Sequence, residues 1–231
     1  MKREKSIILA FIFVVIAGAA LYAPAVEAQQ YTVVRSDSRS GTWEFSLPII
    51  YTDSATIKGQ GGSSADLHEG LGTGFGIGYN INDHFQINGL FSWSSQNYNA
   101  TYVQSNGMAR NYSGHLDSST TALNGVFYLL KGNLTPYISG GIGMTYIDTN
   151  VQNGQNQTTC WWDPWYGYVC SSYTPTKTEY DVSYHAGVGL RWDINERFAL
   201  QGSYNKTWID IHKAQGVPDL DVYRIEIIFR M

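Results

Sequence analysis

Two cysteines lie ten residues apart in the second half of the sequence, and aromatic side chains fill the segment between them. Cys160 and Cys170 are the only cysteines of the chain, so in an exported protein a disulfide between them is the expected state. In the chain-entropy account, such a bridge stabilises a short loop by roughly 2–4 kcal/mol. The enclosed aromatic residues belong to the types that dominate binding interfaces: Trp161, Trp162, Trp165, Tyr166 and Tyr168. The segment predicts a rigid recognition element. The plainer alternatives are self-packing over the mouth of a barrel and contact with a lipopolysaccharide layer.

Nucleophilic catalysis needs a serine or cysteine, a histidine and an orienting acid, and the sequence offers two weak combinations. These are His115 with Ser118 and Ser119, and His185 with Ser183 and Asp181. Neither matches a known catalytic motif, and the second set would lie on one face of a strand. His68 and His212 lack metal-ligand spacing, and the glycines of residues 70–78 alternate as in a strand. We therefore predict no enzyme, no cofactor and no metal site.

Charged residues occupy alternate positions in several segments whose other face is apolar. If these polar faces line a closed interior, the charges there must pair, because an unpaired buried charge costs several kcal/mol. The residues predicted to form this interior network are Glu44, Asp181, His185, Arg191, Arg224, Glu226 and Arg230. Two interpretations remain open for such a network. It could form a solid polar plug, or it could line a weakly conducting, gated pore.

Alternating residues fall into eight runs that predict eight strands. The runs are 42–51, 70–80, 85–95, 117–130, 134–148, 179–192, 198–209 and 220–231. Short turns follow the second, fourth and sixth runs, and long connections follow the others. Residues 78–89 and 189–202 resemble each other, which predicts one turn conformation used twice. Together these features predict an all-β fold, an eight-stranded antiparallel up-and-down β-barrel with both termini at the short-turn end.

The second run decides which face of the barrel points outward. Leu71, Phe75, Ile77 and Tyr79 form one face, and glycines at alternate positions from 70 to 78 form the other. A soluble lipocalin-like barrel would turn the apolar face inward and expose the glycine row to water. In a narrow membrane barrel the glycines leave room for larger interior neighbours. Aromatic residues also flank both ends of the strands, as the two interfaces of a bilayer require. The sequence therefore predicts a transmembrane barrel.

The first 28 residues read as a Sec signal peptide, with a basic start, an apolar stretch and small residues before the cleavage site. We expect cleavage after Ala28, with Ala25 as the second choice and an uncleaved anchor as the alternative. Residues 29–40 are then a short periplasmic N-terminal segment, and residues 41–231 form the outer-membrane barrel. With 15 Lys and Arg against 19 Asp and Glu, the net charge of −4 gives no basic surface for nucleic acid.

These features resemble the OmpA/OmpX-type family of small outer-membrane β-barrels over about residues 41–231. The resemblance rests on the alternating strands, the run of residues 134–143 and the last strand, where Tyr223, Ile225, Ile227 and Phe229 alternate. In this family the last strand carries an assembly signal that closes on an aromatic residue, whereas this chain ends at Met231. The resemblance implies the outer membrane of a Gram-negative bacterium, with extracellular loops and periplasmic termini. It also implies outer-membrane lipid, lipopolysaccharide and the barrel-assembly machinery as partners.

The predicted function is a structural or surface-interaction role of the adhesion or receptor type, carried by long extracellular loops that include the aromatic loop. Its partner would be an extracellular ligand or a host surface. The alternative is a small gated pore or transporter for small or apolar solutes. A lipid A-modifying enzyme, a known use of eight-stranded barrels, ranks third because no motif of those enzymes is present.

Overall fold

A computed structural model of the protein describes residues 38–59, 62–103, 108–152, 157–173, 176–210 and 217–231. The expected signal peptide of residues 1–28 lies outside the described residues, as does most of the segment 29–40. Among the described residues, no helix has the length and apolar character to cross a membrane.

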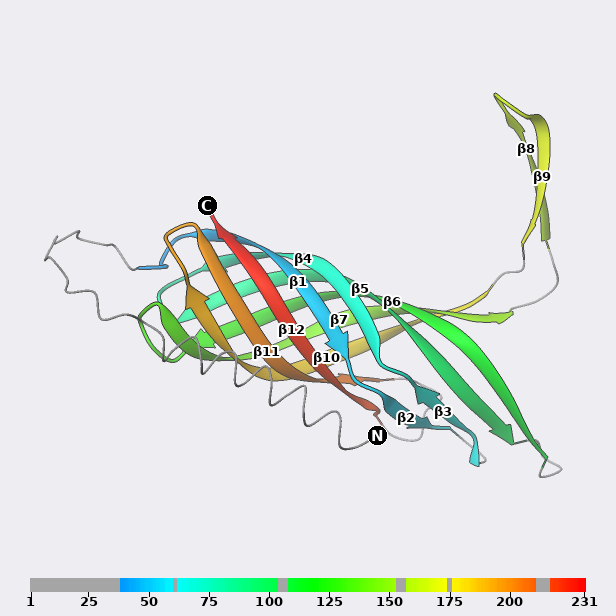
Figure 1. The fold of residues 1–231 in the computed structure, drawn as a ribbon, viewed down its shortest axis with the longest axis horizontal. Coiled ribbons are helices and arrows are strands. Elements are labelled where there is room, and N and C mark those ends of the chain that lie inside the picture. The colour runs from blue at the N-terminus through cyan, green and yellow to red at the C-terminus, as the bar shows by residue number, and fades with distance from the viewer. Residues whose placement is uncertain (1–37, 60–61, 104–107, 153–156, 174–175, 211–216) are drawn as a thin grey trace, which may run out of the picture. The chain divides into compact units, whose positions relative to one another are not determined.

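Eight strands pair antiparallel into a closed ring, in the order β1, β4, β5, β6, β7, β10, β11, β12 and back to β1 (Figure 1). The described residues form twelve strands: β1 Trp43–Thr52, β2 Ala55–Lys58, β3 Ser64–Leu67, β4 Gly70–Asn80, β5 Phe85–Val103, β6 Ala109–Tyr128, β7 Leu134–Gln152, β8 Gln157–Asp163, β9 Gly167–Tyr173, β10 Thr176–Asp193, β11 Phe198–Ile209 and β12 Asp219–Arg230. The closing ladder pairs Glu44 with Arg230 and Thr52 with Val222. The predicted eight-stranded barrel is confirmed, and its ring leaves no free edge.

The strands predicted over 70–80 and 198–209 coincide with β4 and β11. Those predicted over 85–95 and 117–130 are too short at the long-connection end, because the β5–β6 ladder continues to Val103 and Ala109. The predicted long connections also contain two hairpins, β2–β3 and β8–β9. These segments lack the pattern of an apolar outward face and a small or polar inward face that marks a membrane strand, although the backbone pairing continues.

The apolar faces point out of the barrel and the glycine face points in. Leu71 is 68% exposed and Ile77 49% exposed, whereas Gly74, Gly76 and Gly78 between and beside them are buried. A Cβ added at Gly74 would collide with the backbone carbonyl of Phe91 on β5 and would lie 2.8 Å from Ser92 Cα. Close approach of two backbones therefore requires glycine at this position.

Two short turns share one conformation, as the similarity of residues 78–89 and 189–202 predicts. The Asn82 Oδ1 atom accepts the N–H groups of His84 and Phe85, both at 2.8 Å. Asn195 Oδ1 accepts the corresponding N–H groups of Arg197 and Phe198, at 2.8 and 2.9 Å. An asparagine side chain that replaces a backbone acceptor in this way fixes the turn and hence the register of both hairpins.

Candidate functional site

A buried ion-pair cluster fills the short-turn end of the barrel interior. The Arg191 guanidinium, which is fully buried, binds the buried Glu44 carboxylate through two donors, Nη1 to Oε2 at 2.8 Å and Nη2 to Oε1 at 2.7 Å. Gln86 Nε2 donates a third bond to Oε2 at 2.7 Å. The two-pronged arginine–carboxylate geometry is the strongest form of this contact, and the extra donor satisfies a remaining lone pair.

The cluster extends to the last residues of β10 and β12, Asp193 and Arg230. Asp193 Oδ1 accepts bonds from Arg191 Nε at 3.0 Å and from Arg230 Nη2 at 2.8 Å. Arg230 Nε also lies 3.4 Å from Glu44 Oε1, and the buried Tyr128 hydroxyl accepts from Arg191 Nη1 at 2.9 Å. Charges of both signs thus compensate each other directly. We refer to the set Arg39, Glu44, Gln86, Tyr128, Arg191, Asp193 and Arg230 as the turn-side cluster.

Arg39 closes this cluster from the segment that precedes β1. Its side chain is 2% exposed and lies over the Tyr128 ring, 4.5 Å from the ring centroid. Its Nη2 donates to the Leu130 carbonyl at 3.2 Å, and its Nη1 lies 3.6 Å from Asp193 Oδ2. The described end of the predicted periplasmic segment therefore contributes a side chain to the barrel interior.

Asp83, in the turn between β4 and β5, holds the segment that carries Arg39. Asp83 Oδ1 accepts bonds from the Ser38 hydroxyl at 2.7 Å and from the Arg39 backbone N–H at 2.9 Å, while Lys131 Nζ lies 3.3 Å from Oδ2. The Ser38 hydrogen bond, together with those from Lys131 and the Arg39 backbone, lowers the pKa of the Asp83 carboxyl. The ionised carboxylate therefore fixes the position of Arg39.

The other predicted interior charges lie further toward the long-connection end. Arg224 Nε is 3.2 Å from Glu226 Oε1, and Arg224 Nη2 donates to Asn205 Oδ1 at 3.4 Å. Asp181 is buried opposite Thr145 in the ladder, while His185 lies between it and the turn-side cluster along β10. The structure thus brings Glu44, Arg191 and Arg230 together and pairs Arg224 with Glu226.

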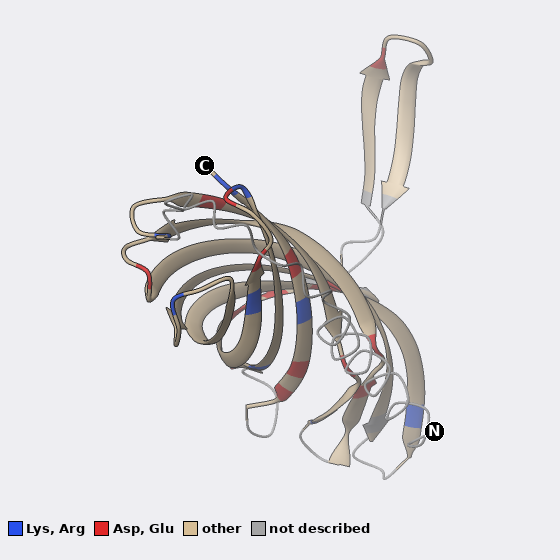
Figure 2. Ribbon diagram, turned by 60° about the vertical axis from the view of Figure 1, so that its left-hand side comes forward, with Lys and Arg blue, Asp and Glu red and all other residues tan. Residues whose placement is uncertain are grey.

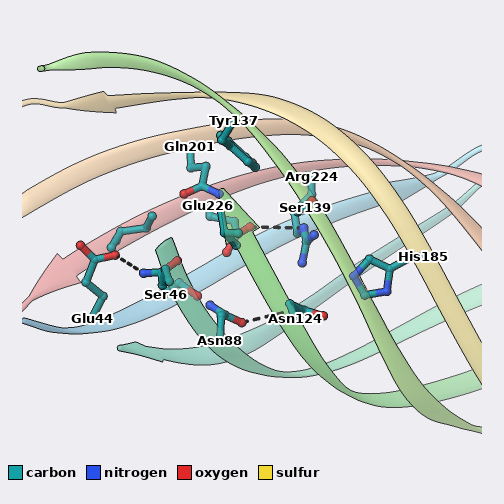
Figure 3. A pocket seen from close by; sticks show the side chains of 13 residues that line it. Glu44, Ser46, Asn88, Asn124, Tyr137, Ser139, His185, Gln201, Arg224 and Glu226 are labelled. Carbon is teal, nitrogen blue, oxygen red and sulfur yellow. Dashed lines mark hydrogen bonds and ion pairs between the residues drawn. The ribbon is translucent and has the colours of Figure 1, made fainter. Parts of the chain in front are cut away.

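Two cavities lie in the barrel interior, and His185 and Arg224 line both. The cavity toward the short turns, shown in Figure 3, has a volume of about 20 Å³. Most of its lining side chains are polar, among them Glu44, Asn124 and His185. A cavity of this size holds about one water molecule. The cavity toward the long connections has a volume of about 110 Å³. Hydroxyl and aliphatic side chains line most of it, together with Gln96, Asn205, His185 and Arg224. The interior is therefore nearly filled next to the turn-side cluster and more open beyond it.

The aromatic segment forms the β8–β9 hairpin, closed by the Cys160–Cys170 disulfide that the sequence predicts. Asp163 Oδ1 accepts the backbone N–H groups of Trp165 and Tyr166 at 2.8 and 3.0 Å, and Gly167 takes the left-handed conformation with φ of 76°. These features define a short, fixed hairpin turn. Trp165 and Tyr166, at the turn, are 85% and 83% exposed.

Both faces of the hairpin carry aromatic side chains. Trp162 stands opposite Tyr168 on the same face as the disulfide, and Trp161 stands opposite Val169 on the other face. All five predicted aromatic residues are exposed. Packing over the barrel mouth, one alternative drawn from the sequence, would have buried these rings. Contact with the lipopolysaccharide layer, the other alternative, is compatible with exposed rings and stays a prediction.

Neither serine–histidine combination weighed from the sequence has a hydrogen bond between its serine and its histidine among the contacts of the described residues, and Ser183 Oγ instead accepts from Thr145 Oγ1 at 3.0 Å. His115 Nε2 lies 2.6 Å from the Ser95 hydroxyl instead of Ser118 or Ser119, and Ser118 Oγ bonds Ser94 Oγ at 2.8 Å. The Ser95 hydroxyl also donates to Asp117 Oδ1 at 2.7 Å, so its hydrogen has a competing acceptor. No group of three metal-ligating side chains is found within the described residues.

Four residues of the turn-side cluster were not predicted from the sequence: Arg39, Gln86, Tyr128 and Asp193. Gln86 and Tyr128 occupy interior positions of predicted strands, so the alternation pattern could have included them. Asp193 begins a predicted short turn beside the interior residue Arg191. Arg39 precedes the first strand and carries no such signal.

Solved barrels with similar folds differ widely from this chain in sequence. The N-terminal β-barrel domain of Pseudomonas aeruginosa OprF aligns with a TM-score of 0.44 and 15% identity, over 83% of this chain and 100% of that one. Yersinia pestis Ail, in complex with the heparin analogue sucrose octasulfate, gives 0.45 and 15%, over 82% and 99%. OprG from Pseudomonas aeruginosa gives 0.46 and 13%, over 83% and 96%. We draw no functional conclusion from any of them.

No curated protein matches the chain. The family of the outer membrane protein beta-barrel domain matches over residues 11–227, which include nearly all of the described barrel. The closed ring of eight strands, its apolar exterior and its polar interior agree with this match. The chain therefore belongs to the outer membrane protein beta-barrel domain family, and its place is the outer membrane of a Gram-negative bacterium.

Proposed function

We propose that this protein works at the cell surface, with the barrel as a membrane anchor and the β8–β9 hairpin as the interaction element. The observation that carries the proposal is the exposure of five aromatic rings on a disulfide-closed hairpin. Soluble surfaces rarely expose contiguous apolar rings of this kind unless they bind something. The disulfide and the Asp163 turn hold the rings in place before contact, which reduces the entropy lost on binding.

This proposal includes an orientation in which the long connections face outward and the termini face the periplasm. The three short turns lie at one end of the barrel, as the periplasmic turns of such barrels do. Lipid and lipopolysaccharide surround the barrel in this setting. The last strand, β12, with its alternating outward residues from Tyr223 to Phe229, is the segment that would engage the assembly machinery.

A small gated pore is the competing function, and the 110 Å³ cavity is the observation in its favour. The turn-side cluster opposes it, because Arg39, Glu44 and Arg191 are buried and bonded to one another or to their neighbours across the interior. Opening a path would require separating these buried ion pairs. Each charge left without its partner would cost several kcal/mol. We therefore assign the barrel to anchoring, and we propose no catalytic role.

Adhesion of a non-adherent Gram-negative host that displays the protein tests this function. We expect the cells to bind a cultured cell layer, and we expect Trp165→Ala combined with Tyr166→Ala to abolish most of that binding. Tyr112→Ala is the matched control, because Tyr112 on β6 is an exposed ring (54%) outside the hairpin. Equal adhesion by all three proteins, at equal surface levels, would contradict the proposed role of the hairpin.

A further inference from the structure

The β8–β9 hairpin is sharply divided into an aromatic tip and a hydroxyl-bearing stem, with the disulfide between them. Beyond the cysteine pair toward the turn lie all five exposed aromatic residues. On the other side of the pair lie the exposed residues Thr158, Thr159, Ser171 and Ser172, of which Thr158 and Ser172 are hydrogen-bonded at 3.0 Å. An apolar tip on a polar stem is the arrangement of a segment that enters an interface between water and an apolar phase.

Charge is almost absent from the hairpin. Asp163 is the single charged residue of the segment 157–173, and Figure 2 shows the hairpin with one acidic band near its turn and no basic one. The Asp163 carboxylate is already engaged by two backbone N–H groups of the turn. The hairpin therefore offers no cation to an anionic partner such as lipopolysaccharide phosphate or an anionic lipid. Its one carboxylate is held in the turn through Oδ1, so aromatic rings make up most of the surface that the tip presents.

The remaining recognition chemistry is that of tryptophan and tyrosine rings, which concentrate at the headgroup level of lipid bilayers. The tip extends beyond the disulfide by about three residues per strand, or roughly 10 Å at the rise of a β-strand. Interfacial segments enter the boundary between headgroups and acyl chains by about 5–10 Å. The tip thus has the composition and the length to fill this layer, and the hydroxyl stem remains in water.

We propose that the tip of the β8–β9 hairpin inserts into the interface of a zwitterionic phospholipid bilayer other than the one that holds the barrel. This inference rests on the proposed function, because it names the partner of the same hairpin. Binding is driven by ring burial and carries no preference for anionic lipid. It requires the disulfide, because a free loop would lose conformational entropy on insertion.

The test uses the full-length protein in nanodiscs, mixed with phosphatidylcholine vesicles that contain brominated lipid. Bromine quenches tryptophan fluorescence only on contact, so a barrel tryptophan such as Trp43 or Trp192, held in the nanodisc, does not report binding to the added vesicles. We expect quenching and co-sedimentation, unchanged by added salt or by phosphatidylserine. Trp165→Ala should lower partitioning about tenfold, the factor expected for roughly 60 Å² of apolar burial lost. Tyr112→Ala should leave it unchanged.

The outcomes separate this inference from the function on which it rests. Adhesion that depends on Trp165 and Tyr166, without binding to phosphatidylcholine vesicles, would overturn the lipid inference and leave a glycan or protein as the partner of the hairpin. Vesicle binding that requires anionic lipid and disappears with salt would also overturn it. If the unmodified protein neither promotes adhesion nor binds vesicles, both proposals are contradicted. A heat-modifiable gel shift in every variant verifies that the barrel is folded.

Discussion

Replacing Glu44 by glutamine tests whether the turn-side cluster holds the barrel together. The substitution keeps the size of the side chain but removes the charge that faces Arg191 and Arg230. It also replaces one accepting oxygen by an NH₂ group, which cannot accept the bond that Arg191 or Gln86 donates. Asp193 remains in contact with both arginines and limits the loss.

Breaking a buried ion pair from one side costs about 3–5 kcal/mol, and the remaining Asp193 contacts place the expected loss near the lower limit, about 3 kcal/mol. The assay is urea unfolding of the refolded protein in lipid vesicles, followed by tryptophan fluorescence and by the heat-modifiable gel shift. Asp117→Asn is the matched control, because that carboxylate is 65% exposed and should change stability by less than about 0.5 kcal/mol.

A double substitution, Glu44→Gln with Arg191→Met, isolates the coupling between the two partners. We expect the double variant to be less destabilised than the sum of the two single variants, by about 1–3 kcal/mol. Additive losses, or a Glu44→Gln variant as stable as the unmodified protein, would refute the assignment of this pair as a stabilising element of the closed interior.

Three further results follow from separate contacts. Gly74→Ala should destabilise the barrel by about 1–3 kcal/mol, because the added Cβ meets the β5 backbone. Gly202→Ala is the control and should be tolerated, because its added Cβ has open space. Equal unfolding midpoints for the two variants would contradict the close approach of β4 and β5. Replacing both cysteines by serine should leave the gel shift unchanged but speed protease cleavage within residues 157–173, as measured by mass spectrometry; unchanged cleavage would show that the disulfide does not order the hairpin. Because folding lowers the pKa of Asp83, its stabilising contribution is fully present above the ordinary aspartate pKa and is lost as the pH falls through the lowered pKa. Asp83→Asn should therefore reduce the loss of stability measured between about pH 6 and about pH 2. An unchanged pH dependence would exclude this role of Asp83.

Sequence reasoning predicted the barrel well because a membrane imposes a simple rule on it. One face of each strand must be apolar and the other small or polar, so β4 and β11 are found at their observed bounds. The same alternation placed Glu44 and Arg230 on the interior of neighbouring strands, where the structure brings them to 3.4 Å. The two asparagine turns were also visible as a repeated pattern.

The pattern is lost where the chain leaves the membrane. Beyond Ser95 the outward residues of β5 become polar, at Asn97 and Asn99, whereas Gln96 and Tyr98 on the inward face stay buried. The apolar exterior that marks a membrane strand therefore ends here, and the last eight residues of β5 were not predicted as strand. The β8–β9 hairpin has aromatic residues on both faces, so it also lacks the alternation on which the strand prediction rests. Arg39 could not be predicted because its position depends on contacts with Tyr128 and Asp83, which are distant in sequence.

A barrel that only anchors surface loops carries no ions, and planar-bilayer conductance measures this directly. With insertion verified by the gel shift, the unmodified protein should give no conductance steps above the baseline, because the turn-side cluster closes the interior beside the short turns. Stable, reproducible steps from the unmodified protein would contradict the closed interior and would favour the pore.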